Sequence, residues 1–298
     1  MQLKSIFFVL VSGCCFVKAG AQQIFKISQF TQHNFLYNPA AAGANDVASV
    51  GATYRKMWSG IDGGPQTVLL FADKYFDKKK VGVGIFLYDD KTGPTSRTGG
   101  ELNVSYSVKL GSDEKRLMFG LAGEFLQYKI DRSALDHQDD PLVATGSGTS
   151  FKGDAGAGIY LKTPTLNLGI SAKQLIQPKL DFLKGNTNPQ GKLYTHYFFM
   201  GSYNWKVDED NVVVPNALLK YQPNAPADFE AGVRLEHRDM LWIGFSYHYK
   251  QSYSAFAGVK IARKLSIGYA YDQYSTPLSI FDKGGDAHEI MLRYFFVK

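Results

Sequence analysis

The chain has 298 residues, of which 45% are hydrophobic, 14% aromatic and 20% charged. This apolar share is too large, and the charge too sparse, for a disordered chain. The formal net charge is +6, but Lys and Arg are scattered along the sequence, so nucleic-acid binding is not expected. Beyond the N-terminus no apolar run approaches the roughly 18 to 20 residues of a spanning helix. The protein is therefore either soluble or crosses a membrane without helices.

Residues 1–21 have the features of a secretory signal peptide. Lys4 supplies the positive charge, residues 6–17 are apolar, and Ala19-Gly20-Ala21 is a small-residue cleavage site. Cleavage after Ala21 makes Gln22 the first residue of the mature chain.

Cys14 and Cys15 are the two cysteines of the sequence. Cleavage after Ala21 removes both, which leaves no thiol for a disulfide, a metal site or a nucleophile. The alternative is that Val11-Ser12-Gly13-Cys14 is a lipobox and Cys14 becomes a lipidated N-terminus. The apolar run continues past Cys14, which favours cleavage after Ala21.

From residue 47 onward, apolar residues recur at every second position, the period of a β-strand with one apolar face. Residues 101–108, ELNVSYSV, show the pattern clearly. Residues 174–184 could form a short helix. The other segments are roughly 8 to 12 residues long, the length of a tilted membrane strand. The predicted strands are 47–54, 66–75, 80–88, 97–110, 116–128, 153–162, 166–175, 193–206, 212–221, 228–237, 240–249, 254–261, 265–272 and 288–297.

The predicted connections alternate between short and long. Short, polar links such as 76–79 and 163–165 follow the even-numbered strands. The longer connections are predicted at 55–65, 89–96, 129–152, 176–192 and 273–287. An up-and-down barrel shows this alternation when one rim lies in the periplasm and the other faces outside. An even strand number puts both termini on the short-turn, periplasmic side.

These features predict an all-β fold, a transmembrane up-and-down antiparallel β-barrel of about 14 strands. In lipid every backbone amide must be paired within the protein, so only helices and closed barrels span a membrane. The terminal Tyr294-Phe295-Phe296 is the aromatic ending expected of such a barrel. The apolar side chains would face lipid, and the lumen would hold Glu101, Lys109, Glu124, Lys173, Glu230, Arg234, Lys260, Glu289 and Arg293. The alternative is a soluble sandwich or lipid-binding barrel whose apolar side chains point inward.

An ordered set of short motifs extends over the mature chain. The motifs are Gln29-Phe30-Thr31-Gln32, Asn38-Pro39-Ala40 with Gly43, Tyr54-Arg55-Lys56-Met57-Trp58, Gly64-Pro65-Gln66-Thr67, Leu102-Asn103-Val104-Ser105-Tyr106, Gly268-Tyr269-Ala270-Tyr271-Asp272 and His288-Glu289-Ile290. Together they resemble the PorP/SprF family of type IX secretion outer-membrane proteins. No single motif is specific, and Met57 stands where the family often has Gln.

The resemblance implies an integral outer-membrane barrel that acts as an accessory in type IX secretion or gliding and is not an enzyme. Its partners would be outer-membrane lipid and either secretion proteins, such as the periplasmic motor ring or the translocon, or a secreted surface protein. The residues alone leave two alternatives open: an outer-membrane channel or hydrophobic-solute transporter, and a soluble secreted binding module.

Candidate residues for binding a partner, or for contacts within the lumen, are Asn38, Pro39, Tyr54, Arg55, Trp58, Pro65, His288 and Glu289. We predict that residues 22–46 form a periplasmic or lumenal segment and that residues 47–298 form the barrel. The Asn38-Pro39 pair is either part of a docking segment or a simple turn. Tyr54, Arg55 and Trp58 either anchor a loop or partner, or are interface aromatics with a snorkelling Arg.

Other chemistry has little support in the sequence. Acidic residues and one histidine gather at 131–140, but their spacing lacks the glycine and closing glutamate of a calcium-binding EF-hand loop, so a solvated loop is expected. The six histidines form no HExxH motif, and no serine has a GxSxG signature. We expect no catalytic residue, no metal and no cofactor.

Overall fold

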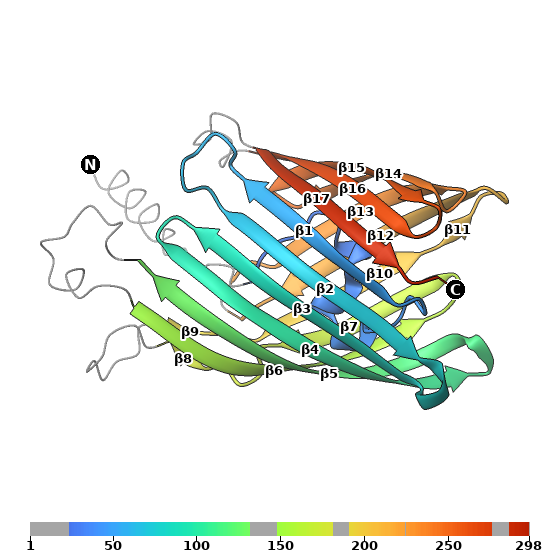
Figure 1. The fold of residues 1–298 in the computed structure, drawn as a ribbon, viewed down its shortest axis with the longest axis horizontal. Coiled ribbons are helices and arrows are strands. Elements are labelled where there is room, and N and C mark those ends of the chain that lie inside the picture. Colours follow the sequence, from blue (N-terminus) through green and yellow to red (C-terminus); the bar gives the residue numbers. More distant parts are fainter. Residues whose placement is uncertain (1–23, 132–147, 181–190, 224, 276–285, 298) are drawn as a thin grey trace, which may run out of the picture.

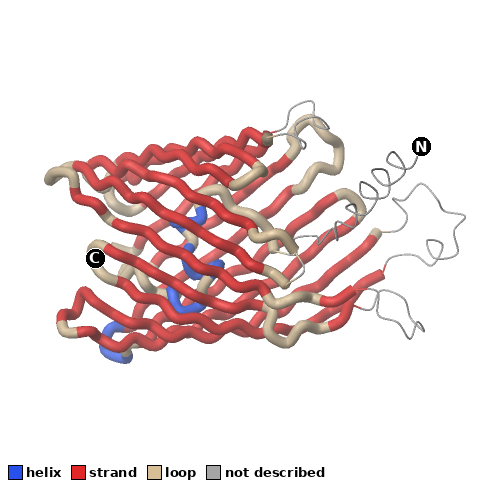
Figure 2. The backbone as a smooth tube through the Cα atoms, turned by 180° about the vertical axis from the view of Figure 1, so that it is seen from behind, coloured by secondary structure: helices blue, strands red, loops and turns tan. Residues whose placement is uncertain are grey.

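The computed structural model describes residues 24–131, 148–180, 191–223, 225–275 and 286–297. Within these ranges fourteen long antiparallel strands form one closed sheet, because the first strand pairs with the last and the eighth pairs with the ninth. Figures 1 and 2 show the resulting barrel with its tilted strands. The predicted transmembrane up-and-down antiparallel barrel is confirmed.

The barrel strands follow one another around the wall in chain order. They are β1 (Ser49–Met57), β2 (Gln66–Phe76), β3 (Val81–Thr92), β4 (Thr95–Leu110), β5 (Ser112–Ile130), β6 (Gly148–Lys162), β7 (Leu166–Lys173), β10 (His196–Tyr203), β12 (Asn211–Tyr221), β13 (Asp228–His237), β14 (Leu241–His248), β15 (Ser252–Ile261), β16 (Leu265–Tyr274) and β17 (Asp286–Phe295).

The remaining elements are short. The strands β8 (Lys179–Leu180) and β9 (Gly191–Lys192) pair with each other, and β11 (Trp205–Lys206) pairs with β12. The helical turns are η1 (Phe30–Gln32), α2 (Asn34–Tyr37), η2 (Pro39–Ala41) and η3 (Asp77–Lys79).

The predicted short helix at 174–184 is wrong for its described part. Residues 174–178 are irregular and lead into β8.

No helix in the described ranges is long and apolar enough to cross a membrane.

The two faces of the wall have opposite chemistry, as period-two alternation predicts. Leu102 is 50% exposed and Leu121 is 69% exposed on the outer face, whereas Glu101, Asn103 and Ser105 are buried on the inner face. Because the exposed set is apolar and the buried set polar, the predicted outward direction of the apolar side chains is confirmed. The alternative with apolar side chains packed inward is wrong.

One of the predicted long connections is wrong. Residues 89–96 belong mostly to β3 and β4, which continue to a tight turn at Gly93-Pro94. Cross-strand polar contacts stabilise this extension: Arg97 donates a hydrogen bond of 2.6 Å to Asp90, and Thr98 donates one of 2.6 Å to Asp89. The strands therefore extend beyond the segment that the apolar pattern marks.

The ends of the barrel differ in their connections. The turns between β2 and β3, β6 and β7, and β15 and β16 span only a few residues, and the barrel begins with β1 and finishes with β17 at this end. We call this the short-turn end, and it carries the C-terminus in Figure 1. The opposite end carries the connection at 58–65, and β5 ends there at Ile130, β7 at Lys173 and β16 at Tyr274. We call it the long-loop end.

Replacement of Leu121 by Arg tests whether the apolar face lies in hydrocarbon. Leu121 points outward within β5, so the guanidinium would enter the acyl chains, and the free energy of unfolding from lipid vesicles should fall by about 2–4 kcal/mol. Leu166→Arg is the control, because Leu166 begins β7 at the short-turn end, where the cost should be about 0–1 kcal/mol. Equal losses for the two variants would contradict a bilayer around the barrel.

Candidate functional site

Residues 24–46 lie inside the barrel, and we call them the lumenal segment. The short helices of this segment are visible within the wall in Figures 1 and 2. Its apolar side chains join inward-facing residues of the wall in the largest buried cluster among the described residues. The cluster includes Ile27, Phe30, Phe35, Leu36 and Tyr37 from the segment and Phe71, Phe86, Tyr88, Met118 and Phe198 from the strands. The lumenal segment therefore provides a core for the barrel, and the inward face of the wall contributes apolar as well as polar side chains to it.

The lumenal segment runs the length of the lumen. Ile24 lines a small cavity with Arg97 and Tyr128, which lie at the long-loop end. At the other extreme, Asp46 forms ion pairs with Arg116 and Lys162 near the short-turn end. The first and last barrel strands do share the short-turn end, but the prediction that both ends of the chain lie there is wrong for the described N-terminal end. The reason is that the segment crosses the interior before β1 begins.

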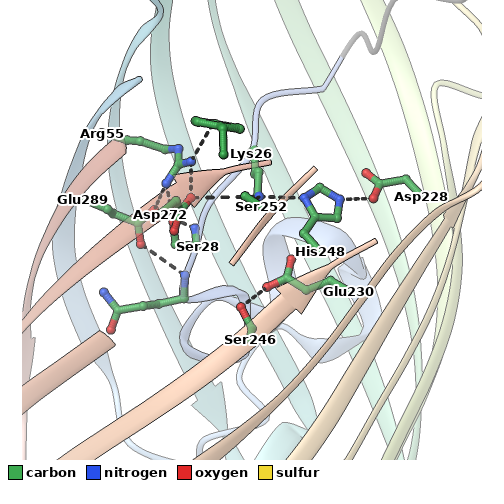
Figure 3. A network of polar contacts seen from close by, with 12 residues as sticks. Lys26, Ser28, Arg55, Asp228, Glu230, Ser246, His248, Ser252, Asp272 and Glu289 are labelled. Atoms are coloured by element: carbon green, nitrogen blue, oxygen red, sulfur yellow. Dashed lines mark hydrogen bonds and ion pairs between the residues drawn. The ribbon is translucent and has the colours of Figure 1, made fainter. Parts of the chain in front are cut away.

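A buried ion network holds the N-terminal part of the lumenal segment (Figure 3). The Arg55 guanidinium of β1 is 0% exposed and donates a 2.5 Å hydrogen bond to the Asp272 carboxylate of β16. It also lies 3.4 Å from a Glu289 carboxylate oxygen of β17 and donates to the Ser28 hydroxyl of the segment. Two carboxylates from the wall thus share one guanidinium with the segment.

Glu289 also binds the segment directly. Its two carboxylate oxygens accept backbone N–H hydrogen bonds from Ser28, at 2.7 Å, and Gln29, at 3.2 Å. The Ser28 hydroxyl donates a further hydrogen bond of 2.9 Å to Asp272. Removing one partner of a buried ion pair typically costs 3–5 kcal/mol, because the remaining charge loses its compensation. The network is therefore a strong attachment point for the segment.

A second series of polar side-chain contacts joins Lys26 of the lumenal segment to β13, β14 and β15 (Figure 3). The Lys26 amine contacts His248 Nδ1 at 2.6 Å and Ser252 Oγ at 2.9 Å, and His248 Nε2 contacts Asp228. A serine beside an amine and a histidine can serve as a nucleophile, but Ser252 is 0% exposed, so no substrate can reach its hydroxyl. These contacts attach the lumenal segment to the wall.

The middle of the segment is fixed through Asn38 and Pro39. The Asn38 side-chain amide donates to the backbone carbonyls of Ile159, at 3.0 Å, and Ile170, at 3.3 Å, and its oxygen accepts the Ala40 N–H at 2.9 Å. This last bond caps η2, whose first residue is Pro39. Glycines of the wall leave room for the close approach, since a Cβ at Gly158 would collide with the Asn38 side chain. In the structure Asn38 is a buried contact between the segment and the wall.

Two further contacts fix the part near the start of β1. His33 packs edge-on against Phe71 and its Nε2 lies 3.3 Å from the Thr53 hydroxyl. Arg293 donates to the Gln32 carbonyl at 2.7 Å and pairs with Asp73 at 2.9 Å. His33 and Gln32 are thereby attached to β1, β2 and β17.

Of the residues proposed from the sequence, Arg55 and Glu289 are brought together across the β1–β17 pairing, while Asn38 and Pro39 lie elsewhere in the lumen. The other four do not join them. Tyr54 is 42% exposed on the outer face, and His288, one residue before the inward Glu289, contacts Tyr269 at 2.6 Å on that face. Trp58 and Pro65 belong to the connection between β1 and β2, where the Pro65 carbonyl accepts the Met57 N–H.

Sequence reasoning missed Lys26, Ser28 and Asp272 as members of the network. Asp272 ends one of the quoted motifs and lies one residue from Tyr271 in an alternating strand, so its inward direction could have been read from the period. Lys26 and Ser28 precede the barrel in a stretch without periodicity, and nothing local marks them. The acidic residues at 132–140 lie outside the described residues. No group of three or more potential metal ligands occurs among the residues that are described.

The wall and its outward apolar face define an integral outer-membrane β-barrel. Solved structures share this fold at low sequence identity. The Ralstonia pickettii toluene transporter TbuX is similar with a TM-score of 0.53 and 11% identity, over 88% of this chain and 92% of that chain. A Pseudomonas aeruginosa FadL homologue is similar with a TM-score of 0.51 and 13% identity, over 87% and 93%. At these identities the likeness concerns the fold alone.

The family follows from the sequence itself. The chain belongs to the type IX secretion system membrane proteins PorP/SprF, whose family pattern matches residues 19–294. This confirms the family resemblance inferred from the ordered motifs. No curated protein matches the chain significantly.

Replacement of Arg55 by Met should loosen the lumenal segment, because Asp272 and Glu289 would remain buried without their guanidinium. The expected loss is about 3–5 kcal/mol in the free energy that holds the segment in place. The readout is the maleimide labelling rate of Ala41→Cys, a buried position of the segment, which should rise strongly in the Arg55→Met background. Tyr54→Phe, on the outer face of the same strand, should leave the rate unchanged. Equal slow labelling in all three proteins would contradict the anchoring role.

Replacement of Gly120 by Val should displace the segment sterically. A Cβ at Gly120 would collide with the backbone of Ala40, and overpacking of this kind costs about 1–3 kcal/mol or more. In a planar lipid bilayer the variant should conduct ions, while the parent protein should not. Gly123→Val is the matched control in the same strand, because a Cβ there meets no atom of the described chain within 4 Å. Conductance by the control, or none by Gly120→Val, would argue against a plug.

Proposed function

We propose that this barrel is a non-enzymatic accessory of type IX protein secretion or gliding that binds the secretion apparatus or an exported surface protein. Membership of the PorP/SprF family carries the proposal. The occupied lumen supports it, since a segment fixed by buried ion pairs leaves the wall as a scaffold with two surfaces for partners. Binding energy would then come from the two rims, while the apolar outer face stays in outer-membrane lipid.

The same proposal includes an orientation. Outer-membrane barrels have short turns on the periplasmic side and longer loops outside. On that rule the short-turn end of this barrel and its C-terminus face the periplasm, and the long-loop end faces the exterior. A partner in the periplasmic motor ring would meet the short-turn end, and an exported surface protein would meet the long-loop end.

A channel or hydrophobic-solute transporter is the second candidate. The observation in its favour is the shared fold with the toluene transporter TbuX and the FadL homologue. The lumenal segment opposes it, because it occupies the lumen with a core in which Phe35, Leu36 and Tyr37 are buried. The conductance of the parent protein distinguishes the two candidates.

Deletion of the gene should abolish secretion or surface display of one or more proteins without changing the uptake of small solutes. The measurement is a quantitative comparison of secreted and surface proteins with and without the gene, alongside permeability to small hydrophilic and aromatic solutes. Complementation with the unaltered gene is the control and should restore the profile. Unchanged secretion with altered permeability would overturn the proposal in favour of a transporter.

A further inference from the structure

Two recesses open at the short-turn end, between the lumenal segment and the wall. Their volumes are about 400 and 410 Å³. Thr31, Asn45, Arg234 and Glu236 line both of them, so the recesses are contiguous, and we call them together the vestibule. Each is large enough for on the order of ten water molecules, and therefore for a ligand larger than a single small ion.

The vestibule is lined by more cations than anions. The cationic side chains are Lys162, Lys206, Arg234, Lys260, Arg263 and Arg293, and the lining carboxylates are Glu236 and Asp239. Some of the cations have carboxylate partners: Arg234 pairs with Glu236 at 2.5 Å and Lys260 with Asp239 at 2.6 Å. Within the described ranges no ion pair involves Lys206 or Arg263, and both are exposed. The two side chains are positive charges available to a ligand.

Arg234 lines both recesses but is less exposed than Lys206 and Arg263. Its side chain is only 12% exposed, and it donates a 2.8 Å hydrogen bond to the Thr31 hydroxyl. Because Thr31 and Glu236 already hold the Arg234 guanidinium, the charges open to a ligand are those of Lys206 and Arg263.

The remaining lining suits a peptide backbone. One recess is bordered by side-chain amides and hydroxyls, which both donate and accept hydrogen bonds. These residues are Asn34, Asn45, Thr163, Asn167, Ser202 and Asn204. The vestibule lies between the wall and the lumenal segment, so an extended peptide can enter it from the barrel mouth.

We propose that the vestibule binds an acidic peptide segment of a partner protein. Carboxylates of that segment pair with Lys206 and Arg263, and its backbone bonds to the amides and hydroxyls of the lining. This deepens the proposed function and rests on it for the compartment that the partner occupies. The contact itself requires only the folded barrel.

The test uses the full mature barrel in uncharged detergent and a short fluorescent Glu-rich peptide. Binding is followed by fluorescence anisotropy at low and high salt, with Gln-rich and Lys-rich peptides of equal length as probes of charge. We expect saturable binding of the Glu-rich peptide alone, weakened by salt, since exposed charge pairs are screened. Binding of the Gln-rich peptide with equal affinity, or no binding of the Glu-rich one, would overturn the proposal.

Charge reversal locates the site. The double variant Lys206→Glu, Arg263→Glu should weaken Glu-rich peptide binding by about tenfold or more. The matched control is Lys78→Glu, Lys79→Glu in η3, which has the same charge change at the same end but does not line the vestibule. The control should change affinity by no more than about twofold. All four substituted side chains are exposed, and a gel shift on boiling confirms that each variant is folded.

Three further outcomes have definite meanings. If both double variants lost the same affinity for the Glu-rich peptide, the peptide would be responding to the overall charge of the barrel end. That result would overturn the vestibule as the binding site. Displacement of the peptide by phosphatidylglycerol added to the micelles would assign the charges to lipid headgroups and also overturn it. Peptide binding combined with unchanged secretion in the deletion strain would retain the site but contradict the proposed secretion function.

Discussion

The closed interior of this barrel depends on the contact between the Arg55 guanidinium and the carboxylates of Asp272 and Glu289. All three side chains lie on the wall, and all three are fully buried because the lumenal segment covers them. A buried charge without compensation is far more costly than a buried pair. The segment therefore excludes water from the network, and the network in turn holds the segment through Ser28 and Gln29.

The period-two alternation of the strands places two sets of side chains in two different environments. Its outer residues face hydrocarbon, while its inner residues face a segment of the same chain that carries both apolar side chains and hydrogen-bonding backbone. Polar inward residues such as Ser171 and Lys173 accordingly donate to backbone carbonyls of Tyr37 and Leu36. A water-filled lumen would need none of these pairings. The interior is thus built as a protein core, which agrees with a scaffold better than with a conduit.

The period-two pattern predicted the strand number, the two faces of the wall and the inward direction of Glu289, because alternation is a property of neighbouring residues. It placed Arg55 in the connection at 55–65, whereas β1 continues to Met57. It did not predict the contacts of Arg55 with Asp272, which is 217 positions away, or with Ser28. Such pairs depend on the strand register and on the closure of the sheet, and a local sequence pattern determines neither of them. The path of residues 24–46 was equally out of reach, because irregular chain inside a lumen has no period. The loop at 89–96 was mistaken because charged residues mark the end of an apolar face and not the end of a strand.

The Arg55–Glu289 pair has a consequence for how the molecule is assembled. Arg55 belongs to the first barrel strand and Glu289 to the last, and the two residues are direct partners where those strands meet. Before that seam joins, the guanidinium and this carboxylate are separated, and the backbone N–H groups of Ser28 and Gln29 lack their shared acceptor. Pairing of the first and last strands and attachment of residues 24–46 are therefore coupled, because both depend on Glu289. The carboxylate of the final strand is therefore shared between barrel closure and the fixing of residues 24–46.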